Sequence, residues 1–302
     1  MSRYTHAIVV RIPSNIRPSP VDQRSLESAR REQEELCEVL RESGVDLIEL
    51  APEQEAAPSS ILVESAAVVV NGTALITRPK TPSNRKEEIL SLLEELAWTV
   101  YEAPAQEAGK PVVLDGADVL FTGKEIFVGV HSLSSSNPKG TNMEGALVVG
   151  HFFPDFAVVP VKVEGSRPLK YHVSLASPEV LTVGAGKEAQ QILRTIEREA
   201  TYRYRTLTIP EERAVNCMNV NGRVVFRHDW QEPNEKFQQL KKAPTTPLQK
   251  QPQADGGGSA VSSRAPSLFG VGVGELCALN GGAHLSANCL LVRKIKNLKN
   301  IW

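Results

Sequence analysis

The chain has 302 residues and a formal net charge of −1 at pH 7, and 41% of its residues are hydrophobic. This composition is ordinary for a globular protein, and the length is sufficient to bury a substantial core. Because 34 Lys and Arg residues balance 35 Asp and Glu residues, neither a nucleic acid nor a membrane surface is expected as a partner.

The N-terminal segment and the cysteines indicate the compartment. Residues 1–18 lack an unbroken apolar core of signal-peptide length, and no segment approaches 18 apolar residues. None of the four cysteines forms a CxxC pair, and no His or Cys cluster has the spacing of zinc ligands. We therefore expect a cytoplasmic protein with reduced cysteines and no metal site.

Three helical segments are expected in chain order, and each is followed by a short β-rich run. The clearest is residues 84–97, NRKEEILSLLEELA, whose leucines and isoleucine form an apolar stripe. Residues 20–43 and 187–200 have similar spacing of apolar positions. The β-rich runs that follow the three helices are residues 45–50, 98–102 and 206–209.

Three β-hairpins are expected between the helices. They span residues 66–76, 117–130 and 214–226, and two of them contain an Asn-Gly pair between β-branched runs. The turn glycines Gly72, Gly123 and Gly222 lie 51 and 99 residues apart, near one and two periods of about fifty, as in propellers or solenoids. The repeated unit is strand, strand, helix, strand. From the residues alone, an ordinary layered α/β sandwich explains the same pattern equally well.

Residues 243–266 have almost no large apolar side chains and are rich in Pro, Gly, Ser and Gln. Such a segment cannot bury enough surface to offset the entropy of ordering, so it is expected to be a disordered surface loop inserted before the last repeat. A docking loop for a protein partner is the alternative.

Two short stretches carry candidate functional groups. Residues 113–119 (VLDGADV) place the carboxylates of Asp115 and Asp118 beside a turn of small residues. Residues 285–292 (LSANCLLV) place Cys289 before an apolar run, after the Gly281-Gly282 pair. From these residues alone, a small core cysteine and a turn-capping aspartate are the more ordinary interpretations.

Together, these stretches resemble the dimethylarginine dimethylaminohydrolase family. The similarity covers about residues 4–242 and 268–294, and its most recognisable motif is LDGADVLFTGKEIFVG at residues 114–129. Other matching stretches, in the expected order, are YTHAIVVR (4–11), ILVESAAVV (61–69), TALITRP (73–79), TN (141–142), DFAV (155–158), LTIP (207–210) and AVNC (214–217). The resemblance implies a pseudo-fivefold α/β propeller of ββαβ repeats, with residues 1–302 as a single domain.

The resemblance also implies a chemistry. In this family a cysteine thiolate attacks the guanidinium carbon of a methylated arginine, and a histidine protonates the leaving amine and then activates water. The products are citrulline and dimethylamine, no cofactor is needed, and the setting is arginine metabolism and nitric oxide regulation. A delocalised cation needs carboxylate acceptors, and a thiol needs a lowered pKa to become nucleophilic. A small guanidino compound is thus the expected ligand.

Several residues carry over to the family's site. Glu64 lies where the family has a carboxylate for the substrate guanidinium, with Ser65 and Asn280 as further candidate substrate-binding residues. Asp115 takes the position of the acid associated with the catalytic histidine. Cys289 lies in or beside the nucleophile's position, although a strict gapless match places Ala287 or Asn288 there.

Other positions depart from the family's pattern. Ser65 replaces an aspartate, and Glu144 replaces the arginine that binds the substrate carboxylate. The catalytic histidine should directly precede Leu169-Lys170, but that position is Pro168, and His172 would need a local shift to replace it. The ordinary interpretation of His172 is a half-buried strand histidine. Proline transfers no proton, and loss of a general acid or base typically lowers the rate about 10²–10⁴-fold.

Three hypotheses follow. In the first, the chain is a working hydrolase of methylated arginine or a related guanidino compound that uses Cys289 and Asp115, with His172 in place of the family's histidine. Alternatively, it is an inactive paralogue that serves as a ligand-binding or protein-interaction module. The third hypothesis is a changed substrate without an α-carboxylate, which Glu144 would suit. We favour reduced or altered activity over the standard reaction.

Overall fold

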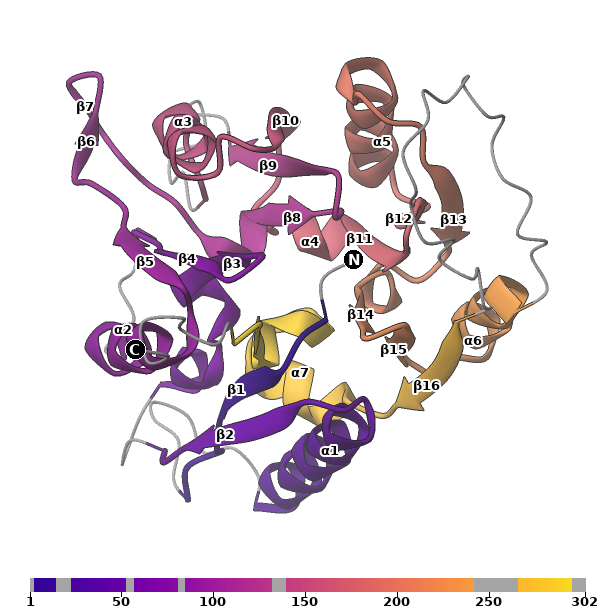
Figure 1. The fold of residues 1–302 in the computed structure, drawn as a ribbon. Helices are drawn as coiled ribbons and strands as arrows, with labels where there is room; N and C mark the ends of the chain where they lie inside the picture. Colours follow the sequence, from indigo (N-terminus) through magenta and orange to yellow (C-terminus); the bar gives the residue numbers. More distant parts are fainter. Residues whose placement is uncertain are drawn as a thin grey trace, which may run out of the picture.

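The computed structural model describes residues 3–14, 23–52, 57–80, 85–131, 140–241 and 266–294. The loop expected at residues 243–266 lies outside these ranges except for Pro266. Five three-stranded sheets and one short two-stranded hairpin form the β-structure of the described ranges. Figure 1 shows the sheets placed around the middle of the molecule, with α1, α2, α3, α5 and α6 on the outside.

The five sheets share one topology, in which a central strand pairs antiparallel with an inner strand and parallel with an outer strand. The sheets are β3 (Ala67–Val70), β4 (Thr73–Ile76) and β5 (Thr99–Glu102); β8 (Val119–Phe121), β9 (Glu125–His131) and β10 (Ala157–Val163); β11 (Val173–Ser177), β12 (Val180–Gly184) and β13 (Arg205–Ile209); β14 (Cys217–Val220), β15 (Arg223–Arg227) and β16 (Ser267–Val271); and β17 (Leu290–Val292), β1 (His6–Val10) and β2 (Asp46–Leu50). The hairpin is β6 (Gln106–Glu107) with β7 (Lys110–Pro111).

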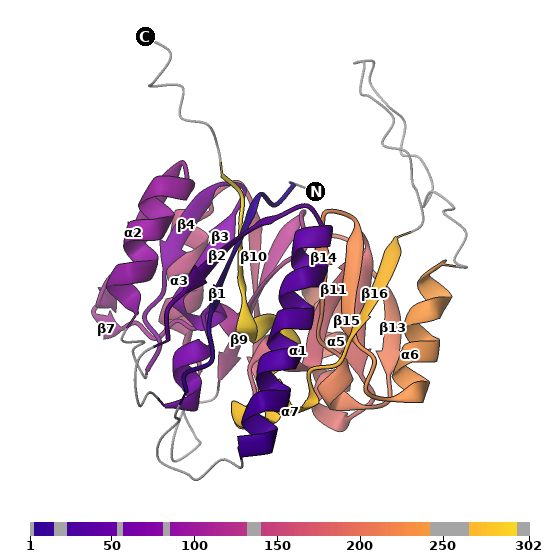
Figure 2. The same ribbon diagram turned by 90° about the horizontal axis from the view of Figure 1, so that it is seen from below.

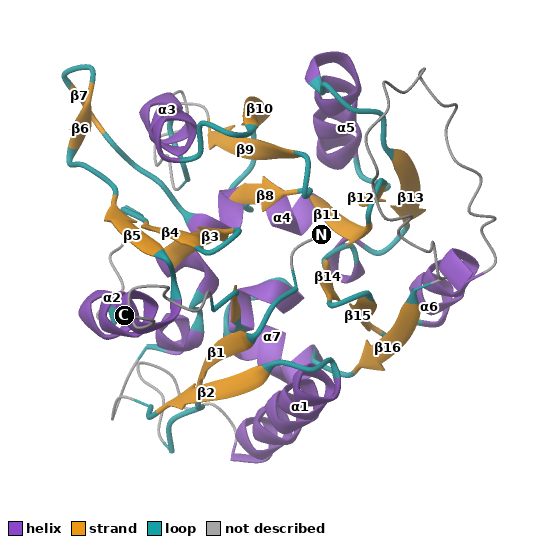
Figure 3. Ribbon diagram, in the orientation of Figure 1, coloured by secondary structure: helices purple, strands orange, loops and turns teal. Residues whose placement is uncertain are grey.

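Helices connect the parallel strands and cover the outer faces of the sheets (Figure 3). The axes of the strands and helices are roughly aligned through the thickness of the molecule (Figure 2). The helices are α1 (Gln23–Glu42), α2 (Lys86–Leu96), α3 (Met143–Phe152), α4 (Leu169–His172), α5 (Lys187–Glu199), α6 (Gln231–Gln238) and α7 (Gly274–Leu279). Four short 3₁₀ turns each precede an inner strand: η2 (Glu64–Ala66), η3 (Gly116–Asp118), η4 (Glu212–Ala214) and η6 (Leu285–Asn288). Two further 3₁₀ turns are η1 (Pro58–Ile61) and η5 (Gln239–Lys241).

The α/β class is confirmed, and none of the described strands closes a barrel. The three predicted hairpins are β3–β4, β8–β9 and β14–β15, and the three predicted helices are α1, α2 and α5. The Asn-Gly turns form because Asn71 and Asn221 both take a positive φ, at 49° and 55°, which Asn tolerates better than most residues. The turn residues therefore set the register of two of the hairpins.

The turns η2 and η3 touch through a glycine without a side chain. A Cβ on Gly116 would lie 2.1 Å from the carbonyl oxygen of Glu64 and 2.9 Å from that of Ala67. Both obstacles are backbone atoms, which cannot rotate away as a side chain could. Gly116 is thus required for two neighbouring sheets to approach each other beside Glu64.

We predict that Gly116→Ala lowers the free energy of unfolding by about 1–3 kcal/mol, because the added methyl group forces two backbone segments apart. The matched control is Gly150→Ala in α3, where a Cβ meets no atom within 4 Å. Replacing this helical glycine should raise the same free energy by about 0.5–1 kcal/mol. Urea denaturation measures the free energy of unfolding of both variants. Equal changes in the two variants would contradict the steric argument.

Candidate functional site

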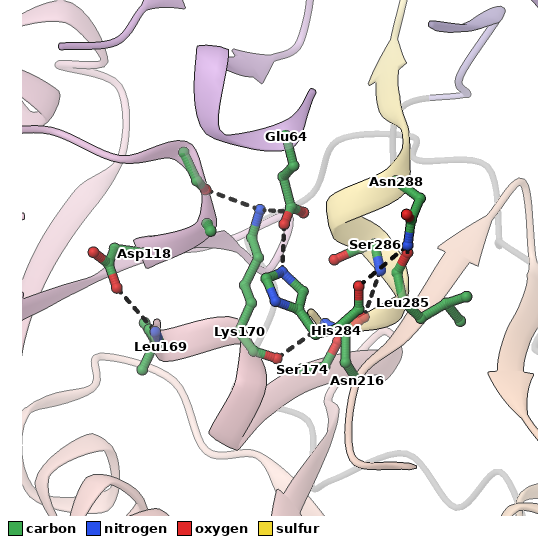
Figure 4. Close-up of polar contacts among 12 residues, drawn as sticks. Glu64, Asp118, Leu169, Lys170, Ser174, Asn216, His284, Leu285, Ser286 and Asn288 are labelled. Atoms are coloured by element: carbon green, nitrogen blue, oxygen red, sulfur yellow. Dashed lines mark hydrogen bonds and ion pairs between the residues drawn. The ribbon is translucent and has the colours of Figure 1, made fainter. Parts of the chain in front are cut away.

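The Glu64 carboxylate lies where three distant segments of the chain meet (Figure 4). Glu64 begins η2 and is only 7% exposed. Its Oε1 accepts a hydrogen bond from Lys170 Nζ at 2.9 Å, and its Oε2 accepts one from His284 Nε2 at 2.6 Å. Each carboxylate oxygen thus has its own donor.

These two donors keep Glu64 ionised. Burial is the largest single effect and by itself raises the pKa of the carboxyl group, but the charges and hydrogen bonds of Lys170 and His284 outweigh it. The net result is a pKa lowered to about 2. Glu64 is therefore a carboxylate at neutral pH and acts as an acceptor only.

Lys170 and Asn216 bring further segments to the same place. Lys170 Nζ also donates to the carbonyl oxygen of Gly116 at 3.1 Å. The Asn216 side chain donates to the carbonyl oxygen of Lys170 at 2.9 Å and accepts from the Ser286 backbone N–H at 2.8 Å. These bonds connect α4, η3 and η6 around Glu64.

Asp118 organises a second buried network nearby. Its Oδ1 accepts from His131 Nε2 at 3.0 Å and from the Leu169 backbone N–H at 2.9 Å. Its Oδ2 accepts from the backbone N–H and the hydroxyl of Thr141, both at 3.0 Å. Asp118 thereby fixes the backbone directly after Pro168, the position where the resemblance leads us to expect a catalytic histidine.

His131 is held as an imidazolium by its two partners. Nε2 faces the Asp118 carboxylate, and Nδ1 faces the carbonyl oxygen of Gly165 at 3.2 Å. Both partners are acceptors, so both ring nitrogens must carry protons. Burial lowers the pKa of His131, but the hydrogen bond and charge of Asp118 reverse this and leave the pKa raised. With both nitrogens occupied, His131 is a structural residue.

The structure brings Asp115 and Ser65 together. Asp115 Oδ1 accepts from the Ala117 backbone N–H at 2.9 Å, so it caps η3 as the ordinary interpretation expects. The Ser65 side chain also donates a hydrogen bond to this carboxyl group. Burial, followed by the nearby charge of Asp118, raises the pKa of Asp115 to about 6.

Cys289 lies in the core near Glu64, and its sulfur faces the sulfur of Met218. It is 3% exposed, and its Sγ lies 3.4 Å from Met218 Sδ. Burial, with a smaller contribution from the Glu64 charge, raises the pKa of the thiol. A thiol in this state holds its proton at neutral pH, which is the opposite of what a nucleophilic cysteine needs. Cys289 is packed as a small core residue.

A cavity of about 150 Å³ adjoins this cysteine. Its wall contains Cys289, Glu64, Lys170 and Ser286 together with apolar side chains of the inner strands.

Two further candidate residues, Asn280 and Asn288, are hydrogen-bonded to each other: Asn280 Nδ2 donates to Asn288 Oδ1 at 3.2 Å. Asn288 in turn donates to the carbonyl oxygen of Leu285 at 3.0 Å.

His172 does not line the cavity that Cys289 lines. It ends α4, so it is a helical and buried residue, and the expectation of a half-buried strand histidine was wrong. Within the described ranges, neither of its ring nitrogens has a hydrogen-bond partner, and Nε2 lies 3.6 Å from Glu188 Oε2 on α5. Lys170, two residues earlier on the same short helix, points to Glu64 instead. His172 as the catalytic histidine stays a prediction.

Glu144 and Pro168 occupy helix starts. Glu144 lies in the first turn of α3, and its Oε1 is 3.4 Å from Lys110 Nζ. Pro168 directly precedes α4, where its extended backbone suits the start of a helix. Neither side chain supplies what the family's arginine or histidine would supply.

Two residues of this group, Lys170 and His284, are not indicated by the sequence. Lys170 belongs to a motif that should directly follow a histidine, and His284 belongs to no recognised motif. The one sequence feature that could have indicated His284 is its place shortly after the adjacent glycines Gly281 and Gly282.

Among the described residues, no cluster of three His, Cys, Asp or Glu side chains could hold a metal ion, and no helix is long and apolar enough to cross a membrane.

Comparison with known proteins identifies relatives. The chain is 33% identical over 226 residues to the putative hydrolase DDAH2 of Homo sapiens, which covers 72% of this chain and 75% of that protein. It is 27% identical over 199 residues to the N(G),N(G)-dimethylarginine dimethylaminohydrolase of Pseudomonas aeruginosa, which covers 64% of this chain and 71% of that protein. No model of a known protein family matches the chain.

Solved structures share the fold. The dimethylarginine dimethylaminohydrolase of Pseudomonas aeruginosa in complex with citrulline superposes with a TM-score of 0.68 at 19% identity, over 96% of this chain and 100% of that one. The N-terminal domain of ArgZ, a cyanobacterial arginine dihydrolase bound to its substrate, superposes with a TM-score of 0.69 at 14% identity, over 96% and 98%.

We predict that part of the stability depends on protonated His131. Because the folded-state pKa is raised, this contribution is complete below the unfolded value of about 6.5 and is lost as the pH rises through the folded value. His131→Gln should lower the free energy of unfolding by about 1.5–3 kcal/mol at pH 6 and by less at pH 8.5. Urea denaturation across this pH range measures both quantities.

The control for this prediction is His151→Gln on α3. Its side chain is 65% exposed and lies 3.5 Å from Glu107, so its removal should leave the pH dependence of the parent chain intact. A His131→Gln variant that destabilises equally at both pH values would contradict the imidazolium assignment.

Proposed function

The chain belongs to the dimethylarginine dimethylaminohydrolase family, and from this premise we propose that it binds a small guanidino compound and hydrolyses it with reduced activity or not at all. The observation that carries the proposal is the state of Cys289, a buried thiol with a raised pKa that contacts Met218. Without a thiolate and a neighbouring base, attack on a guanidinium carbon loses both its nucleophile and its proton carrier.

The ligand-binding half of the proposal rests on Glu64. Its carboxylate is buried, ionised and adjacent to a cavity, and a buried carboxylate is the natural partner of a guanidinium group. Asp115, the cap of the adjoining turn η3, is a further acceptor, to which Ser65 on η2 donates. Relatives support the class of ligand, since the Pseudomonas aeruginosa enzyme was solved with citrulline and ArgZ with its substrate.

We infer that the five sheets are the blades of a single pseudo-fivefold domain. The shared strand order supports this, as does the last sheet, in which β17 near one end of the chain pairs with β1 near the other. Because the last sheet joins segments from near both ends of the chain, we expect the five sheets to unfold together. Calorimetry and circular dichroism should report the same single transition, and two separable transitions would contradict a single domain.

We predict that purified protein releases citrulline from dimethylarginine at least about 10²-fold more slowly than the Pseudomonas aeruginosa enzyme under the same conditions. Cys289→Ser should leave the residual rate unchanged, because the thiol does not act as the nucleophile. Cys37→Ser, at another buried cysteine, controls for effects on folding. Turnover comparable to the relative that disappears in Cys289→Ser would contradict the proposal.

We predict further that Glu64→Gln weakens binding of arginine or dimethylarginine at least about tenfold, since a neutral amide cannot pair with the guanidinium charge. Isothermal titration calorimetry measures the dissociation constant, and the control is Glu95→Gln at an exposed position of α2.

Agmatine is titrated in the same series because it lacks the α-carboxylate that Glu144 would repel. Tighter binding of agmatine than of arginine would favour the changed substrate.

A role as an interaction module stays a prediction. The segment that would bind a protein partner, residues 243–266, lies outside the described residues except for Pro266.

A further inference from the structure

A short strap of residues 281–284 crosses from α7 to η6 and brings His284 to Glu64. Two successive glycines, Gly281 and Gly282, have positive φ angles of 69° and 78°. Two adjacent left-handed residues suit glycine far better than any residue with a side chain. The chain reverses here and turns the next side chains toward the interior, where His284 is only 4% exposed.

The strap is fastened at both ends. At its glycine end, Arg167 Nη1 donates to the carbonyl oxygens of Gly281 at 3.1 Å and Gly282 at 3.0 Å. The Arg167 guanidinium also lies over the Tyr171 ring, 5.1 Å from its centroid. At its other end, His284 Nε2 lies 2.6 Å from Glu64 Oε2.

The protonation state of this contact follows from the carboxylate. Glu64 is ionised and can only accept, so His284 Nε2 must carry the hydrogen. The second oxygen of Glu64 already accepts from Lys170. A guanidinium group binds a carboxylate best through two parallel N–H···O bonds, one to each oxygen. In this structure, the imidazole N–H stands at one of those two oxygens.

We propose that His284 determines how strongly a cationic ligand can pair with Glu64: its N–H occupies Oε2, and a guanidinium gains an unshared contact with this oxygen only by displacing the strap. The inference rests on the proposed function in one respect, that Glu64 is the carboxylate the ligand uses. The affinity of the site is then the strength of the new ion pair minus the cost of breaking the His284–Glu64 bond.

His284 is better suited to this role than Lys170. The Lys170 ammonium has a second acceptor, the carbonyl oxygen of Gly116, and the backbone of Lys170 is held by Asn216. His284 is carried by a segment with two glycines, and among the described residues its side chain has Glu64 as its single hydrogen-bond partner. The imidazole can therefore leave at the cost of one bond, whereas Lys170 would lose two.

The test is calorimetric titration of the full chain with methylguanidinium chloride, which presents the cation without other groups. His284→Ala frees Oε2, and we expect it to bind at least about tenfold more tightly than the parent chain. His284→Gln is the matched control, because its amide N–H can still donate to Glu64 and should leave the affinity within about threefold of the parent. An affinity of His284→Ala equal to or below that of the parent overturns the inference.

A second variant keeps the test decisive if His284→Ala does not fold. Arg167→Ala releases the glycine end of the strap while leaving the imidazole and Glu64 in place. We expect about threefold tighter binding of methylguanidinium, because displacing a loosened strap costs less. An unchanged dissociation constant in this variant counts against the inference in the same way.

The outcomes separate this inference from the proposed function. If the parent chain binds no guanidino compound but His284→Ala does, the role of His284 stands and ligand binding by the native chain is contradicted. If both bind with equal affinity, the proposed function stands and the inference falls. The double variant Glu64→Gln/His284→Ala should lose whatever affinity His284→Ala gains, since the gain depends on the freed carboxylate.

Discussion

The carboxylate of Glu64 is the point on which the interior of this protein depends. Lys170, 106 residues away, and His284, 220 residues away, both donate to it from other sheets' connections. Removing one member of a buried ionic group leaves an uncompensated charge, which typically costs about 3–5 kcal/mol. The contacts of Lys170 and His284 with Glu64 therefore fix how η2, α4 and η6 meet. Through these turns, they also fix where the inner strands β3, β11 and β17 lie.

Asp118 performs the same kind of task one sheet further on. It accepts four hydrogen bonds, from His131, Leu169 and Thr141, and is 1% exposed. A buried carboxylate is tolerable when its lone pairs are filled in this way. Glu64 and Asp118 together hold the segment around Pro168 from two sides, so its backbone cannot easily shift to bring His172 inward.

These constraints act differently on the two sides of the site. The acidic side of the site persists, because Glu64 and Asp115 are held by donors that belong to the fold itself. On the other side, Cys289 packs against Met218 in the core, and burial raises the pKa of its thiol. The proposal of reduced activity rests on this difference between the two sides, because a nucleophilic thiol needs a lowered pKa.

The sequence by itself determined the local elements and the family. Asn71-Gly72 and Asn221-Gly222 could form only tight hairpins between β-branched runs, and the apolar stripe of residues 86–96 could be buried only as a helix. The order of motifs pointed to the dimethylarginine dimethylaminohydrolase family, which its relatives confirm. These features depend on neighbours a few residues apart or on the order of motifs along the chain, so both can be read from the sequence.

Only the tertiary structure decided the composition of the site. Nothing near His284 in the sequence indicates that its imidazole meets Glu64, and nothing near His172 indicates that it turns to Glu188 on α5 instead of toward Cys289. The two contacts around Glu64 join segments that lie 106 and 220 residues apart in the sequence. Their geometry comes from how the sheets pack, because burial forces each charged group to find a partner wherever the fold brings one within reach.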